Sequence, residues 1–201
     1  MPSLANEIRR LNFPGAGRVP ASLFVTDERR MPDLVRAAQS LSPGSGIVFR
    51  HYGLSKRARA ECAARLAAVA RERGLALFIA NDLAIARAVG ACGLHLPEHA
   101  LANTRLLHAA RAHGLAVTVA AHSWPAVVRA AERSVDAALV SPVFPTASHP
   151  GARHLGVLRL AWIASHASVP VYALGGVTDR NVRGVRRCGC AGVAALGALS
   201  V

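Results

Sequence analysis

The sequence predicts a single (β/α)8 barrel, a TIM barrel of the short form, with an extra helix at its N-terminus. Three observations support this fold class. Short apolar runs recur at fairly even intervals, stretches with helical spacing separate them, and polar or small residues follow nearly every run. Alternation of strand and helix is typical of parallel sheets, and eight repeats allow such a sheet to close into a barrel. The 201 residues are at the short end of the range for this fold.

The predicted strands are nearly continuous in apolar character and do not alternate with polar residues. This pattern is typical of parallel strands that are covered on both faces. The eight predicted strands are residues 22–27 (SLFVTD), 46–52 (GIVFRHY), 76–82 (ALFIAND), 93–97 (GLHLP), 116–122 (AVTVAAH), 137–143 (AALVSPV), 169–176 (VPVYALGG) and 192–199 (GVAALGAL).

Stretches rich in alanine, arginine and leucine lie between these runs and have the spacing of helices. Residues 55–74, 102–114 and 179–189 are examples. Each ends on a glycine, the residue that most readily adopts the left-handed conformation after a helix. These glycines are Gly74, Gly114 and Gly189.

The chain is predicted to form one barrel domain over residues 21–201, after a short helix and a Gly/Pro loop in residues 1–20. An open, doubly wound sheet is the competing architecture. It is disfavoured because no GxGxxG motif follows the first predicted strand. No linker divides the chain, and no repeat longer than the strand–helix unit is visible.

Composition predicts a cytoplasmic protein without a membrane segment. Hydrophobic residues make up 52% of the chain, yet no apolar run reaches the roughly 18 residues of a membrane span, and the N-terminus lacks the apolar core of a secretory signal. The four cysteines include no CxxC pair, so buried thiols in a reducing compartment explain them better than a metal site does. The oligomeric state is left open, with a homo-oligomer as one alternative.

The net charge of +13 raises the question of a nucleic-acid partner. The basic residues are almost all arginine, with Lys56 as the only lysine, and they are scattered over several predicted helices. The aromatic platforms of single-strand binders are missing, since aromatic residues make up only 4% of the chain. Nucleic-acid binding is therefore the least favoured function, and small anionic ligands are favoured.

One predicted strand ends in two glycines within VYALGGVTDRNV (171–182). Residues without a Cβ let backbone N–H groups approach a ligand closely, and a helix start behind them would add a positive dipole. Gly175 and Gly176 are therefore candidates for a phosphate cup, with a plain tight turn as the alternative. In a barrel of this kind the active site gathers at the carboxyl ends of the strands, where these glycines would lie.

The assembled strand ends resemble those of thiamine phosphate synthase and its relative, the thiazole tautomerase. The resemblance extends from LFVTD (23–27) to GALS (197–200). Its strongest parts are FIANDLAIARAVGACGLHLPEHAL (78–101), SPVFPTASHPG (141–151) and VYALGGVTDRNV (171–182).

The resemblance implies two small-molecule substrates and their binding residues. Gly175, Gly176 and the region of Gly197 would hold the phosphate of a thiazole, and Thr146 would add a hydroxyl. Other strand ends would hold the pyrimidine diphosphate and its Mg²⁺. Mg²⁺ is a hard ion that prefers carboxylate and phosphate oxygens. The residues implied there are Arg50 and Asn81 for the diphosphate, Asp82 for Mg²⁺ and His95 beside the pyrimidine ring.

The sequence departs from the synthase pattern at several places. Val48 stands where a glutamine is expected, Tyr52 and His149 where lysines are expected, and Ala100 where a second magnesium carboxylate is expected. Loss of cations that stabilise a departing diphosphate predicts reduced synthase activity. The residues that could compensate are His149, Arg153, His154, Glu98 and His99.

His122 offers a second interpretation, because it ends the fifth predicted strand in VAAHSWP. In the tautomerase branch a histidine at this place shuttles a proton, for which a pKa near neutrality is well suited. The alternative is that His122 only caps the next helix through Ser123 or packs near Trp124. Three functions stay open: synthase, thiazole tautomerase, and a noncatalytic protein that binds a thiamine phosphate.

Overall fold

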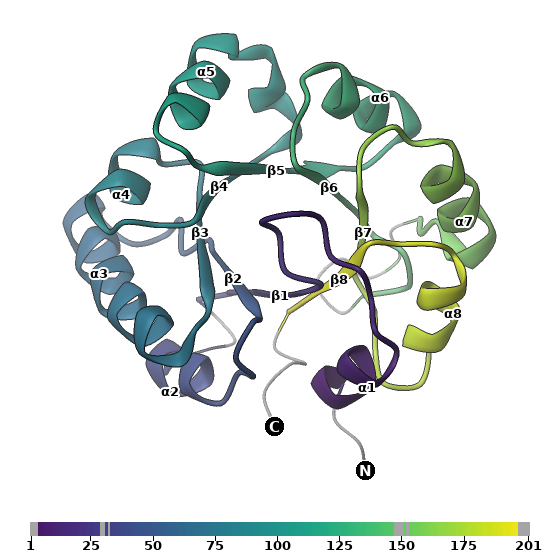
Figure 1. The fold of residues 1–201 in the computed structure, drawn as a ribbon, viewed down its shortest axis with the longest axis horizontal. Helices are drawn as coiled ribbons and strands as arrows, with labels where there is room; N and C mark the ends of the chain where they lie inside the picture. Colours follow the sequence, from purple (N-terminus) through teal and green to yellow (C-terminus); the bar gives the residue numbers. More distant parts are fainter. Residues whose placement is uncertain (1–3, 29–30, 32, 147–150, 152, 197–201) are drawn as a thin grey trace.

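The chain folds into a closed barrel of eight parallel strands, as the sequence predicts (Figure 1). The computed structural model describes residues 4–28, 31, 33–146, 151 and 153–196. Each strand pairs with the next along the chain, and the first pairs with the last. The strands are β1 (Ser22–Val25), β2 (Gly46–Phe49), β3 (Ala76–Ala80), β4 (Gly93–Leu96), β5 (Ala116–Ala121), β6 (Ala137–Val140), β7 (Val171–Leu174) and β8 (Gly192–Leu196).

Helices form an outer ring around the barrel, and the predicted N-terminal helix precedes it. Five of the outer helices start at an Asp, Ser or Asn whose side chain accepts the N–H three residues later, which satisfies one free donor of the first turn. The helices are α1 (Leu4–Arg10), α2 (Leu34–Gln39), α3 (Lys56–Arg73), α4 (Leu83–Ala88), the 3₁₀ helix η1 (Glu98–Ala102), α5 (Thr104–Ala112), α6 (Trp124–Glu132), α7 (Gly156–His166) and α8 (Val182–Arg187).

Two buried apolar layers explain why the strands lack alternation. One set of side chains fills the barrel, including Val48, Phe78 and Tyr172. Their neighbours along the strands, such as Phe49 and Ile79, pack outward against the helices. Both faces of each strand are thus removed from water, as expected for a parallel sheet.

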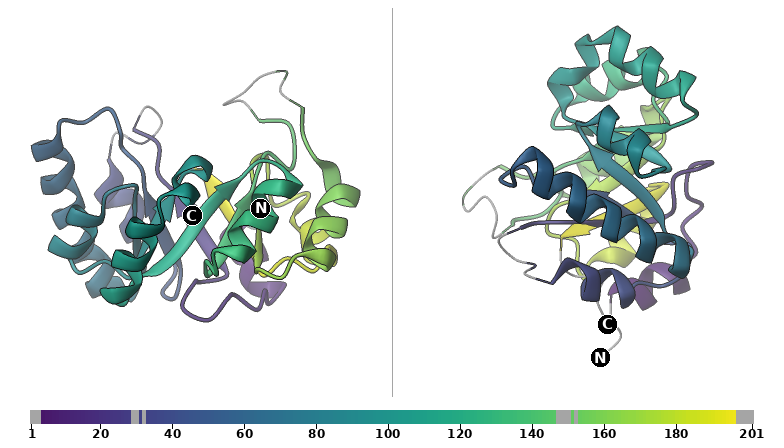
Figure 2. Two further views of the ribbon diagram at one scale, coloured as in Figure 1. Left: turned by 90° about the horizontal axis from the view of Figure 1, so that it is seen from above. Right: turned by 90° about the vertical axis from the view of Figure 1, so that its left-hand side faces the viewer.

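The segment between α1 and β1 closes one end of the barrel. Val19 is buried among the interior side chains, and the Tyr172 hydroxyl donates to the Val19 carbonyl at 2.7 Å. The Gly15 N–H donates to the Ala191 carbonyl at 2.8 Å. Figure 1 shows this segment across the near opening, and Figure 2 (left) places the β6–α7 connection at the opposite end. The carboxyl ends of the strands therefore face the other opening.

The predicted elements differ from the observed ones mainly at their ends. The predicted helix over 102–114 shortens to α5, with the 3₁₀ helix η1 directly before it, and the predicted helix over 179–189 shortens to α8. Residues 177–181 therefore separate Gly176 from the helix, so that no helix start lies directly behind the two glycines. Several predicted strands are longer than the observed ones. The sequence gives no clear signal for where an apolar run stops being a strand, so the polar residues that follow it were included.

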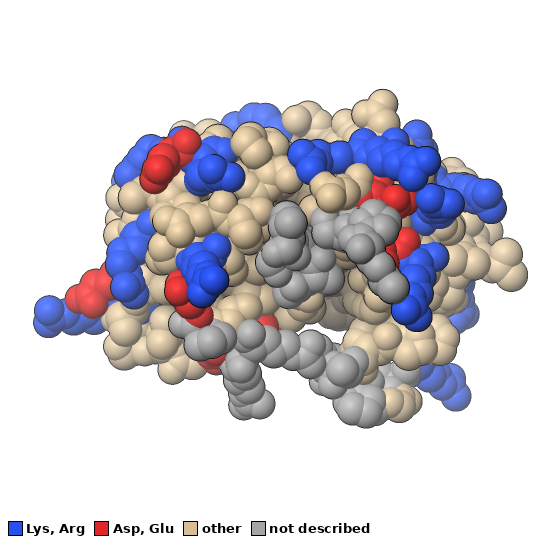
Figure 3. All heavy atoms as spheres, turned by 90° about the horizontal axis from the view of Figure 1, so that it is seen from below, with Lys and Arg blue, Asp and Glu red and all other residues tan. Residues whose placement is uncertain are grey.

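Charged side chains are dispersed over the surface. On the face in Figure 3, arginines lie around the periphery with acidic side chains among them. In the described part of the chain, no helix is both long enough and apolar enough to cross a bilayer.

Candidate functional site

The carboxyl ends of the strands bring the predicted polar residues to one opening. Side chains alternate along a strand, so a residue two positions beyond an inward one also faces the interior. Val48 lies in the interior cluster, which places Arg50 toward the mouth of the barrel. Ala116 lies in the same cluster, which places His122 in the same row of β5.

A pocket of about 210 Å³ lies at the ends of β1 and β2. The Arg50 N–H donates to Thr26 Oγ1 at 3.0 Å, which ties the two strand ends together. The Gly53 N–H donates to both carboxylate oxygens of Glu28, at 3.2 and 3.0 Å. The pocket is lined by Thr26, Asp27, Glu28, Arg50, His51 and Tyr52.

Two arginines lie over the ring of Tyr52, which stands where the resemblance implies a lysine. The guanidinium carbons of Arg50 and Arg59 lie 5.9 and 5.4 Å from the centre of its ring. Cations over an aromatic face are attracted by the ring quadrupole. Burial raises the pKa of Tyr52, with both arginines opposing that shift. Positive charge is therefore present here without a lysine.

Asp82, the predicted magnesium ligand, makes two contacts within the protein. Its Oδ1 accepts the Ile85 N–H at 2.9 Å as the cap of α4, and its Oδ2 pairs with Arg59 at 3.3 Å. Arg59 is 8% exposed and also donates to the Ala80 carbonyl. Mg²⁺ is usually bound by one or two carboxylates together with phosphate oxygens, and Ala100 supplies no oxygen ligand from its side chain. These residues do not fit a magnesium site.

Asn81 ends β3 in a left-handed conformation with φ of 52°. Its N–H donates to the His95 carbonyl at 2.8 Å, which continues the pairing with β4 by one residue. Asparagine tolerates this backbone better than most residues. The turn leaves its side chain exposed beside Asp82.

His95 is buried in the barrel wall and is uncharged at neutral pH. Its Nδ1 lies 3.0 Å from Thr118 Oγ1 on β5. Burial, reinforced by the Arg50 guanidinium, lowers the pKa of His95 to about 3. The imidazole of His95 can therefore form hydrogen bonds, but it does not carry a positive charge at neutral pH.

His122 is exposed at the end of β5, and its orientation is fixed by two partners. Its Nδ1 lies 3.0 Å from the Ser141 carbonyl and 3.2 Å from Ser141 Oγ. Its main-chain N–H donates to Glu98 Oε2 at 3.1 Å, and Glu98 Oε1 accepts from Arg129 at 2.8 Å. Ser123, not His122, caps α6 by accepting the Ala126 N–H.

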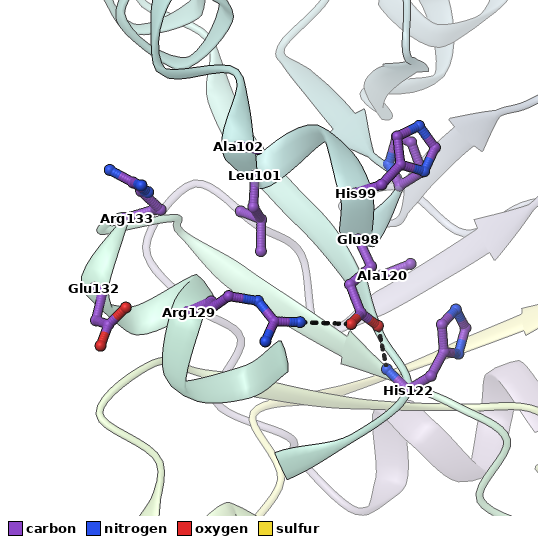
Figure 4. A pocket seen from close by; sticks show the side chains of 10 residues that line it. Glu98, His99, Leu101, Ala102, Ala120, His122, Arg129, Glu132 and Arg133 are labelled. Carbon is purple, nitrogen blue, oxygen red and sulfur yellow. Dashed lines mark hydrogen bonds and ion pairs between the residues drawn. The ribbon is translucent and has the colours of Figure 1, made fainter. Parts of the chain in front are cut away.

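A cavity of about 650 Å³ surrounds this network. Figure 4 shows the imidazoles of His99 and His122 on the same side, with Glu98 between them and Arg129 reaching Glu98 from α6. The cavity is lined by Pro97, Glu98, His99, Leu101, Ala102, Ala120, His122, Arg129, Glu132 and Arg133.

Gly175 and Gly176 directly follow β7 and have φ of 90° and 67°. A Cβ on Gly176 would lie 2.5 Å from the Pro145 carbonyl oxygen, and one on Gly175 would lie 3.0 Å from Pro142 Cα and 3.3 Å from Thr146 Cγ2. The glycines are thus required for close packing of the loop after β6, whatever they bind. Both are half-buried, as is Thr146. His149 and Gly197 lie outside the described residues.

Sequence reasoning missed three side chains that organise these strand ends. Arg59 is one of many arginines on a predicted helix, and nothing in its spacing marks it as buried. Nothing in the sequence around Arg129 indicates that it contacts Glu98 either. Ser141 offered a signal, since it ends the apolar run AALVS directly before a proline.

The fold and site define the chain as a (β/α)8 barrel with polar and charged side chains at the carboxyl ends of its strands. The profile described as thiamine monophosphate synthase matches residues 22–199. The chain is 32% identical to the thiamine-phosphate synthase of Chlorobium limicola, over 90% of this chain and 86% of that protein. It is 30% identical to that of Limosilactobacillus fermentum, over 94% and 87% respectively.

The structure is similar to that of a thiamine phosphate pyrophosphorylase from Pyrococcus furiosus. The TM-score is 0.75, the sequence identity 24%, and the match covers 96% of this chain and 87% of the other. The chain belongs to the thiamine monophosphate synthase family.

Proposed function

We propose that the chain is an enzyme of thiamine biosynthesis that binds a thiazole phosphate and moves a proton from one carbon of that ligand to another. The observation that carries this proposal is the position of His122, held by Ser141 beside a cavity of about 650 Å³. Membership of the family supports the choice of ligand class.

The contacts of His122 favour a general base. A carbonyl oxygen only accepts hydrogen bonds, so the short contact with Ser141 O requires the proton on Nδ1. The lone pair then lies on Nε2, which the ring presents away from Ser141. Glu98 fixes the main chain of His122, which limits the motion of the ring during proton transfer.

The proposed phosphate position is adjacent to this base. Ser141 contacts His122 and is followed by Pro142, which packs against Gly175. A phosphate held by the main chain at Gly175 and Gly176, with the Thr146 hydroxyl, would therefore lie next to the histidine. Backbone amides in such turns form anion-binding concavities.

A second candidate function is coupling of the thiazole phosphate to a pyrimidine diphosphate. Arg50 favours it, since it lies at the barrel mouth close enough to His95 to influence its pKa. Asn81, at the end of β3, would join Arg50 on the diphosphate in this reaction. Val48 and Ala100 oppose it, because neither supplies the polar side chain expected of a synthase.

The test is isomerisation of the carboxylated thiazole phosphate, followed by NMR. We expect His122→Asn to lower the rate by about 10²- to 10⁴-fold, the usual contribution of a general acid–base group. His108→Asn is the matched control, because His108 is exposed on α5. An unchanged rate in His122→Asn contradicts the proposal.

Two further results separate the alternatives. Formation of thiamine phosphate from both substrates identifies a synthase. Calorimetric binding of the thiazole phosphate without either reaction identifies a noncatalytic binding protein.

A further inference from the structure

A buried arginine, Arg59, lies beside Asp82, the residue that the resemblance assigns to Mg²⁺. Arg59 reaches from α3 to Asp82 Oδ2 at 3.3 Å and to the Ala80 carbonyl. Its guanidinium carbon also lies 5.7 Å from the centre of the Phe49 ring. An ion pair with carbonyl and aromatic contacts is held in one geometry, so this cation is a fixed part of the site.

Three carboxylates near the strand ends accept hydrogen bonds from protein donors. Asp82 is shared between Arg59 and the cap of α4. Glu98 is shared between Arg129, at 2.8 Å, and the His122 N–H. Glu28 accepts the Gly53 N–H. A divalent ion bound by any of these three carboxylates would have to displace a protein donor, and at Asp82 it would also lie beside the Arg59 guanidinium, which repels it.

Positive charge reaches the mouth through arginine instead. Arg50 is half-buried and shares the exposed ring of Tyr52 with Arg59. Guanidinium groups bind phosphate oxygens through paired N–H donors and stay charged at any physiological pH. The charge that a phosphate needs is therefore present without a metal.

We infer that this site takes a phosphate or diphosphate ligand without a divalent metal, and that Asp82 is the counter-ion of Arg59, not a metal ligand. The inference rests on the proposed function only in taking the strand ends as the ligand-binding face. It concerns the β2–β3 side, whereas the proton transfer concerns His122 on β5.

The experiment measures pyrophosphate binding by calorimetry, in excess EDTA and in excess Mg²⁺. We expect binding in EDTA and no gain in affinity with Mg²⁺. Affinity that appears only with Mg²⁺ overturns the inference, as does the absence of binding under both conditions. Turnover of the thiazole phosphate is a separate measurement, so either proposal can fail without the other.

Asp82→Asn distinguishes the two roles of the carboxylate by the sign of its effect. Asparagine still caps a helix, so α4 is expected to form. If Asp82 only neutralises Arg59, the variant gains one net positive charge and binds pyrophosphate about threefold to tenfold more tightly in EDTA. If Asp82 holds a metal, the variant loses Mg²⁺-dependent binding, which overturns the inference.

Glu61→Gln is the matched control for the change in charge. Glu61 pairs with Arg57 on the exposed face of α3. The Glu61→Gln substitution therefore also removes the acidic partner of an arginine, but at a position away from the mouth. We expect its affinity for pyrophosphate to equal that of the unmodified chain. An equal gain in both variants would mean that overall charge, not Arg59, controls binding, and would overturn the assignment.

Discussion

His95 shows how far a single residue can depart from its behaviour in water. Its position in the fourth predicted strand can be read from the sequence. Its burial against Thr118 cannot be predicted from the sequence, because this contact joins β4 to β5 and depends on the register of the two strands. The same applies to Arg59, whose partners come from β3 and the start of α4.

The low pKa of His95 predicts acid sensitivity. The ordinary histidine pKa is 6.5 and that of native His95 is about 3, so between these values the unfolded chain binds a proton that the native protein does not. Stability therefore falls as pH falls below 6.5, by about 1.4 kcal/mol per pH unit from this residue.

Urea unfolding at several pH values checks this expectation. His95→Asn keeps a partner for Thr118 and should flatten the loss of stability between pH 6.5 and 5 by about 2 kcal/mol. His108→Asn, at an exposed position, should retain the full loss. Equal slopes in His95→Asn and the unmodified chain would show that His95 is not the group responsible.

At the level of the element, two strands begin with glycines that large rings cover. A Cβ on Gly93 would lie 2.3 Å from the Phe78 ring, and one on Gly192 would lie 2.3 Å from the Tyr172 ring. These rings fill the barrel interior only because the neighbouring strands offer no side chain there. The apolar runs predicted the strands, but the pairing of glycine with ring depends on register and could not be predicted.

Gly93→Ala is expected to destabilise the protein by about 1–3 kcal/mol through overpacking, or more if the Ala116 carbonyl cannot move. Gly184→Ala on α8 is the control, because its Cβ meets only Val157 at 3.5 Å. Alanine is the better helix former, so this control should gain about 0.5–1 kcal/mol. Denaturant midpoints measure both, and a neutral Gly93→Ala would disprove the packing argument.

For the whole molecule, a net charge of +13 produces a field that attracts anions. We expect the association rate of a thiazole phosphate to fall as salt rises, because the Debye length shrinks from about 10 Å at 0.1 M to about 3 Å at 1 M. Stopped-flow measurements at low and high salt check this. The dephosphorylated thiazole carries less negative charge and should show a weaker dependence, and equal salt dependence of both ligands would contradict the expectation.

The fold of the whole molecule was the part most open to prediction. Eight apolar runs, with Gly74 closing the longest helix, define a barrel before any contact is known. For the candidate site, the sequence predicted which residues follow the strands but not the contacts between them. Its charge pairing depends on contacts such as Glu98 with Arg129, which are 31 residues apart and on different elements.

The pairing of β1 with β8, and the bond from Gly15 to Ala191, join segments from the two extremes of the chain. During synthesis on a ribosome, the first strand must wait for the last one to emerge from the exit tunnel. Until then one edge of the sheet stays unpaired and open to association with other nascent chains. Closure of the barrel therefore leaves the growing polypeptide with an open sheet edge until translation of the last strand is complete.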